Sequence, residues 1–177
     1  RVGLFGAYGT APTVVNATCP TCQAVAGSGQ PFYRIGGDAS LTFDGQWNLF
    51  GAVMYGNDSK NLFASQGITN AQRASWVGAF VQLDWYPTLL PVVHTPGWLL
   101  SYRYDVIHNI QQGDPTFAKD YNNVNSHTFM GRYYLHQSSR TDIALHMEYN
   151  FFQTAKVGTG SGDLHGQTLL SGIDFAF

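Results

Sequence analysis

Apolar and polar side chains alternate with a period of two in eight segments of the chain, and every charged residue within these segments falls on one parity. The last segment shows it most clearly. Residues 169 to 177 read Leu-Leu-Ser-Gly-Ile-Asp-Phe-Ala-Phe, so Leu169, Ile173, Phe175 and Phe177 share one parity. Successive side chains of a β-strand point to opposite faces of its sheet. The pattern therefore predicts strands with one aromatic and aliphatic face and one small or polar face.

Seven further strands are predicted from segments of the same kind, separated by turn and loop residues. Their ranges are 2–10, 32–43, 47–55, 75–85, 98–108, 127–136 and 142–153, and the eighth strand follows residue 163. The connections after the second and sixth strands are tight, the one after the fourth holds three prolines, and the others are long and polar. We therefore predict an all-β, antiparallel up-and-down fold that forms a single domain over residues 1–177.

Composition limits the partners of such a chain. Only 11% of the residues are charged, against about 25% in a typical soluble domain, and 15% are aromatic. A net charge of −2 without a basic run gives no indication of a nucleic-acid partner. No stretch of about 18 apolar residues predicts a membrane helix. The low charge suits a protein whose outer surface meets lipid.

The face opposite the apolar one is predicted to carry the ionic side chains, among small Gly, Ala and Ser residues. Its candidate pore-lining or interior-lining residues are Arg34, Asp38, Asp84, Arg103, Asp105, Arg132, His146, Glu148 and Asp174, and His127 and His136 are assigned to the same face. An unpaired ion in a barrel interior would be costly, so these ions are expected to pair.

The alternation alone does not tell which face is outside, because a soluble up-and-down barrel alternates in the same way with its apolar residues inward. Three features favour the apolar face as the outside. Its side chains are too large and numerous for a closed interior. Trp residues lie beside the short turns and Tyr residues towards the long loops, as expected for the two interfaces of a membrane. The apolar face also lacks the Lys and Glu residues of a water-facing exterior.

The terminal Gly172-Ile173-Asp174-Phe175-Ala176-Phe177, together with the eight-strand pattern, resembles the C-terminal region of bacterial outer-membrane porin-like β-barrels. The resemblance implies a transmembrane barrel in the bacterial outer membrane, surrounded by outer-membrane lipid, with its long loops on the outside. It also implies that the barrel assembly machinery reads Phe177 as a signal, that a secretory signal is removed, and that no cofactor is bound. The eight strands fit a complete small barrel or the C-terminal part of a larger one, and the position of Arg1 suits both.

Two functions follow from these expectations. Mixed charges on the inner face fit a porin-like channel for small hydrophilic solutes, which needs a barrel wider than eight strands because water channels have about 16–18. In an eight-stranded barrel the same residues would form a packed polar interior. The protein would then be a non-conducting anchor or scaffold that binds other outer-membrane or periplasmic proteins through its long loops.

Other motifs give weaker indications. Cys19 and Cys22 form a Cys-Pro-Thr-Cys sequence in the first long loop, for which a disulfide or spare thiols are favoured. A structural zinc needs about four ligands, and a c-type haem needs His rather than Gln23 after the second Cys. A metal site between the sixth and seventh strands is a weaker interpretation than hydrogen-bonded histidines. No local motif supports a Ser/His/Asp set, so neither an enzyme nor a metal site is predicted.

Overall fold

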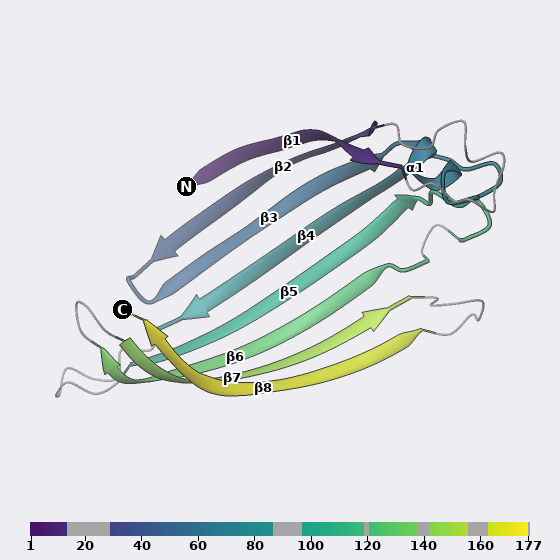
Figure 1. The fold of residues 1–177 in the computed structure, drawn as a ribbon. Coiled ribbons are helices and arrows are strands. Elements are labelled where there is room, and N and C mark those ends of the chain that lie inside the picture. Colours follow the sequence, from purple (N-terminus) through teal and green to yellow (C-terminus); the bar gives the residue numbers. More distant parts are fainter. Residues whose placement is uncertain (14–28, 87–96, 119–120, 138–141, 156–162, 177) are drawn as a thin grey trace.

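The computed structural model describes residues 1–13, 29–86, 97–118, 121–137, 142–155 and 163–176. Eight strands form one antiparallel sheet in which each strand pairs with the next along the chain (Figure 1). The strands are β1 Val2–Pro12, β2 Gly29–Phe43, β3 Trp47–Asp58, β4 Ala74–Trp85, β5 Trp98–Gln111, β6 Val124–Gln137, β7 Asp142–Thr154 and β8 Leu164–Ala176. A short helix, α1 (Lys60–Ala64), lies between β3 and β4. The predicted all-β, antiparallel up-and-down fold is confirmed.

The two ends of the sheet differ in how well the sequence predicts them. At the short-turn end, which holds the turn at 44–46 and both chain termini (Figure 1), the predicted limits Phe43, Trp47, Trp85 and Trp98 are those observed. At the opposite, long-loop end the strands run on by one to three residues, and β5 for instance ends at Gln111 rather than at 108. Backbone groups make the ladder bonds, so pairing continues where the side chains have already become polar.

The register confirms that the apolar positions form one continuous face. A single row of paired residues crosses seven strands and is apolar throughout: Leu41, Leu49, Leu83, Tyr102, Phe129, Tyr149 and Leu169. The neighbouring row on the other face is mostly polar and contains Asp84 and Glu148. Paired residues of an antiparallel sheet share a face, so the two sets of side chains stay apart across the sheet.

The apolar face is not covered by any other part of the described chain. Leu99 and Ala144 are the buried hydrophobic residues of the described ranges. By contrast, the side chain of Leu4 is 91% exposed and that of Leu169 is 68% exposed. None of the helices within the described ranges is long and apolar enough to cross a membrane.

The sheet is curved but open. β1 and β8 lie at its opposite edges (Figure 1), and the hydrogen-bonded order that starts at β1 ends at β8 without returning to β1. The eight described strands therefore do not form a closed barrel by themselves.

At the long-loop end, the connection between β3 and β4 is held against the connection between β5 and β6. Ser59 caps α1 by accepting a hydrogen bond from the backbone of Asn61. The backbone N–H of Gln72 donates to the carbonyl oxygen of Gly113 at 2.8 Å. The ring of Phe63 lies so close to Gly113 that a Cβ there would collide with it. These contacts join two loops that are far apart in the sequence.

Candidate functional site

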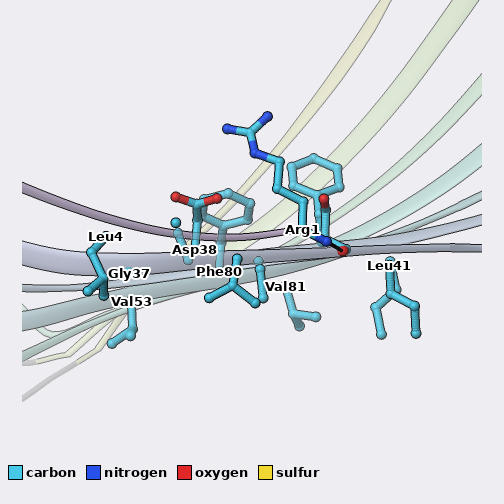
Figure 2. Close-up of a pocket in the computed structure, with 16 residues that line it drawn as sticks. Arg1, Leu4, Gly37, Asp38, Leu41, Val53, Phe80 and Val81 are labelled. Carbon is cyan, nitrogen blue, oxygen red and sulfur yellow. Dashed lines mark hydrogen bonds between the residues drawn. The ribbon is translucent and has the colours of Figure 1, made fainter.

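The candidate site is the polar face of the sheet. The register places all nine predicted residues on this face: Arg34, Asp38, Asp84, Arg103, Asp105, Arg132, His146, Glu148 and Asp174. Figure 2 shows the separation around β1 to β4, where the side chains of Arg1 and Asp38 project on one side and those of Leu4 and Leu41 on the other. Gly and Ala residues leave little side-chain volume on this part of the sheet, and together with their neighbours they line a hollow of about 740 Å³.

Arg34 is held between a carboxylate and two aromatic rings. Its guanidinium lies 2.7 Å from Asp58 Oδ1 and donates to the carbonyl oxygen of Asn57 at 3.0 Å. The same group lies 5.1 Å from the ring centres of both Phe32 and Trp76. Asp58 was not predicted as the partner, because it falls in the segment after residue 55 that was expected to be a loop.

Arg103 pairs with the residue two positions further along the same strand. Its Nε lies 2.9 Å from both carboxylate oxygens of Asp105, and its Nη2 lies 2.5 Å from Oδ1. Residues i and i+2 of a strand point to the same face, which explains the pairing. The guanidinium also lies 4.3 Å from the ring centre of Phe80.

A third group of charges links β6, β7 and β8. Arg132 Nη2 lies 2.8 Å from Asp174 Oδ2. His146 lies between two carboxylates, with Nδ1 3.4 Å from Asp174 Oδ2 and Nε2 3.6 Å from Glu148 Oε2. The expectation that the ions pair is thus confirmed for all three arginines of the predicted set.

Asp84 is bound by neutral donors instead of a cation. The residue is only 7% exposed, and its carboxylate accepts hydrogen bonds from Ser101 Oγ at 2.7 Å, Gln82 Nε2 at 2.8 Å and Asn48 Nδ2 at 3.4 Å. Burial, with a smaller contribution from Asp84, raises the pKa of the nearby Tyr86 phenol.

Replacing Ser101 by Ala removes the shortest of these hydrogen bonds from a buried carboxylate. We expect the free energy of unfolding to fall by about 1.5–3 kcal/mol, as for other hydrogen bonds to charged groups, measured by urea titration. Ser126→Ala is the matched control, because Asn150 donates to Ser126 Oγ and to Thr128 Oγ1 alike and keeps the second acceptor. Equal losses for the two variants would contradict this role of Ser101.

Two histidines do not lie where the sequence analysis placed them. His127 pairs with Tyr104 on one side and Phe151 on the other, so it belongs to the apolar face. Its parity is that of Phe129, and a consistent count along β6 would have found this. His136 pairs with Ile143 after a register shift in β6, which moves it to the apolar face as well. The strand-six histidines therefore do not join His146 on the polar face.

Some predicted features are not tested by the structure. Cys19, Cys22 and Phe177 lie outside the described residues. Within the described ranges, no three His, Cys, Asp or Glu side chains gather closely enough to hold a metal ion. The chemistry that the polar face offers is thus a set of half-exposed ion pairs and hydrogen-bonding groups, suited to contact with water and small ions.

Comparisons of the chain with protein families, with curated proteins and with solved structures gave no match.

Proposed function

We propose that the sheet is part of the wall of a transmembrane β-barrel in a bacterial outer membrane, and that its polar face lines a channel for small hydrophilic solutes. The observation that carries the proposal is an apolar band that crosses the strands obliquely and is backed by a charged face.

The exposure of the apolar face supports a lipid environment. Side chains such as Leu4, Ile35 and Met147 are more than half exposed and face away from the charged residues. Monomeric soluble proteins rarely expose a continuous apolar surface of more than a few hundred Å². In a membrane, the acyl chains of lipids would cover this face.

The limits of the apolar band give a strand tilt. Leu49 of β3 and Leu169 of β8 lie in one row, five strand spacings apart. On β3 the band continues six residues beyond this row to Tyr55, whereas on β8 Leu169 is its last large apolar residue. The border of the band therefore shifts by about 20 Å along the strands over about 24 Å across them, which corresponds to a strand tilt of about 40°. At the short-turn border, which runs from Trp47 of β3 to Phe175 of β8, the same calculation gives a strand tilt of about 30°.

The tilt is what a membrane barrel requires. Strands of outer-membrane barrels tilt by about 35–45° around an apolar band about 25 Å tall. On β2 the band runs from Tyr33 to Phe43, a rise of ten residue steps or about 33 Å, which projects to about 25 Å at that tilt. A planar lipid layer explains an apolar band at this angle to the strands.

Aromatic side chains gather at both borders of the band. At the short-turn border, Trp47 stacks on Trp85 with ring centres 5.4 Å apart, and Trp98 contacts Tyr133 at 4.6 Å. At the long-loop border, Tyr33 and Tyr55 lie 6.0 Å apart, and Tyr102 and Tyr104 lie near His127. Trp and Tyr favour the two interfaces of a membrane.

The accessibility of the charged face supports a water-filled lumen rather than a packed interior. The side chains of Arg103 and Asp105 are 42% and 32% exposed, and those of Arg132 and Asp174 are 30% and 40% exposed. The open curve of the sheet leaves this face uncovered. A lumen wide enough for solutes needs more strands than the eight described here.

A non-conducting scaffold is the second candidate, and the loop contacts favour it. Gln111 Nε2 donates to Gln72 Oε1 at 2.8 Å, which adds to the bond between Gln72 and Gly113. These contacts would give the long-loop end an ordered surface that another protein could bind.

Planar bilayer recordings separate the two functions. The chain, in the form isolated from its membrane, is expected to give discrete conductance steps in KCl. Membrane insertion without conductance would favour the scaffold, and failure to insert would contradict both candidates. Insertion is measured independently, by protection of the strands from added protease in lipid vesicles.

A further inference from the structure

A hollow with several polar groups on its walls interrupts the apolar face across β4 to β7. Its volume is about 490 Å³, and it is lined by Val81, Tyr102, Tyr104, Asn125, His127 and Gln153. The register places all six on the apolar face: Tyr104 pairs with Val81 and His127, and Asn125 pairs with Gln153. The hollow extends from Asn125 and Gln153, at the long-loop border of the apolar band, to Val81 within the band.

Two tyrosine hydroxyls use acceptor atoms of this hollow. Tyr104 donates to Asn125 Oδ1 at 3.1 Å, so the amide nitrogen of Asn125 keeps its donors. The hydroxyl of Tyr102 lies 2.9 Å from His127 Nδ1. With the hydroxyl as the donor, the neutral imidazole carries its proton on Nε2, at the other side of the ring. Both side chains then offer N–H groups, which suit an anionic ligand.

For a second imidazole on the same face, the hydrogen bonds determine which ring nitrogen accepts. The backbone N–H of Asn109 donates to Asn123 Oδ1 at 2.7 Å, so the Nδ2 amide of Asn123 is the group 2.9 Å from His108 Nδ1. Because Nδ1 must accept this bond, neutral His108 carries its proton on Nε2. His165 lies near Phe151, with ring centres 6.2 Å apart. Three histidines thus border the apolar band at this end.

The carboxylate of Asp163 lies close to Gln153, one of the residues that line the hollow. Asp163 accepts a hydrogen bond from Gln153 Nε2 at 2.6 Å. An anion in the hollow must therefore bind on the side of His127 and Asn125, away from Asp163. The apolar row of Leu83, Tyr102 and Phe129 lies next to that side, towards the short-turn end.

We propose that this hollow binds the phosphate of a membrane phospholipid, with His127 and Asn125 as hydrogen-bond donors and the acyl chains lying along the apolar band. The inference rests on the proposed insertion of the sheet into a membrane. A lipid is favoured over free phosphate because the hollow opens onto the apolar face, where Val81 and the tyrosine rings form its walls. With the headgroup at the long-loop border and the acyl chains extending towards the short-turn end, the lipid matches the order of polar and apolar residues along the strands.

The test is lipid retention by the folded chain in detergent micelles, measured by native mass spectrometry with dioleoyl phosphatidylglycerol as the probe. His127→Phe keeps an aromatic ring and removes the donor, and it is expected to weaken retention about tenfold, the loss of one hydrogen bond to a charged group. His136→Phe is the matched control on the same strand at the short-turn end, and it should change retention less than about twofold. Asn125→Leu should also weaken retention, and it replaces His127→Phe in the test if that variant does not fold.

Two further probes distinguish the source of the anion. Dioleoylglycerol has the same acyl chains but no phosphate. The unsubstituted chain should retain it no better than the His127→Phe variant retains dioleoyl phosphatidylglycerol. Inorganic phosphate in millimolar excess should not displace the lipid. Equal retention of dioleoylglycerol, displacement by phosphate, or unchanged retention by the variants would each overturn the inference while leaving membrane insertion intact. A chain that fails the protease-protection test in vesicles would overturn the proposed function as well.

Discussion

Arginine in place of Val81 is expected to prevent stable insertion of the chain into lipid vesicles. Val81 lies at the middle of the apolar face of β4, between Val77 and Trp85. An arginine at the bilayer midplane of a barrel costs about 2–4 kcal/mol. The proposed insertion therefore predicts a loss of this size in the free energy of folding into vesicles, measured by urea titration of Trp fluorescence.

The neighbouring position supplies a control with the same new side chain. Gln82 points to the polar face, where it donates to Asp84. Gln82→Arg places the guanidinium near that carboxylate and in contact with water, so we expect a change below about 1 kcal/mol. If Val81→Arg and Gln82→Arg fold into vesicles equally well, the apolar face does not meet lipid.

The second large effect concerns ion selectivity. Arg103→Glu replaces the cation of the Arg103–Asp105 pair with a second carboxylate on the same face. If this face lines a lumen, the reversal potential in a KCl gradient should shift towards cation selectivity. A several-fold change in the ratio of cation to anion permeability is expected, because charges that line a confined path select ions by their sign.

Arg73→Glu is the matched control for this variant. It changes the charge by the same amount at an exposed loop residue just before β4, where water and salt screen its effect. Conductance that persists in Arg103→Glu with unchanged selectivity would remove Arg103 from the ion path. Loss of folding in Arg103→Glu alone would instead indicate that the pair supports the sheet.

The sequence was sufficient for the fold class and for the separation of the faces, because both depend on a period of two that the chain repeats eight times. The row from Leu41 to Leu169 follows from that period once the strands pair in order. The short-turn ends were also predictable, since Asp44 and Gly45 adopt positive φ angles of 54° and 61° and such turns favour Asn, Asp and Gly.

Other features depend on geometry that the period does not contain. The register shift near His136 changes the face of a residue without changing the sequence pattern. Asp58 became a partner of Arg34 because β3 continues past its apolar part. Whether the sheet closes depends on the curvature accumulated over all strands and not on any local segment, so the open edges could not be foreseen.

Those edges restrict what can complete the wall. β1 runs from the short-turn end to the long-loop end, and β8 runs back (Figure 1). Any set of strands that bridges the two edges and keeps every neighbour antiparallel must therefore be even in number. In the proposed barrel, such strands would form whole hairpins, and the two ends of this set would lie on the same side of the membrane as Arg1. A lone extra strand could be antiparallel to only one of the two edges.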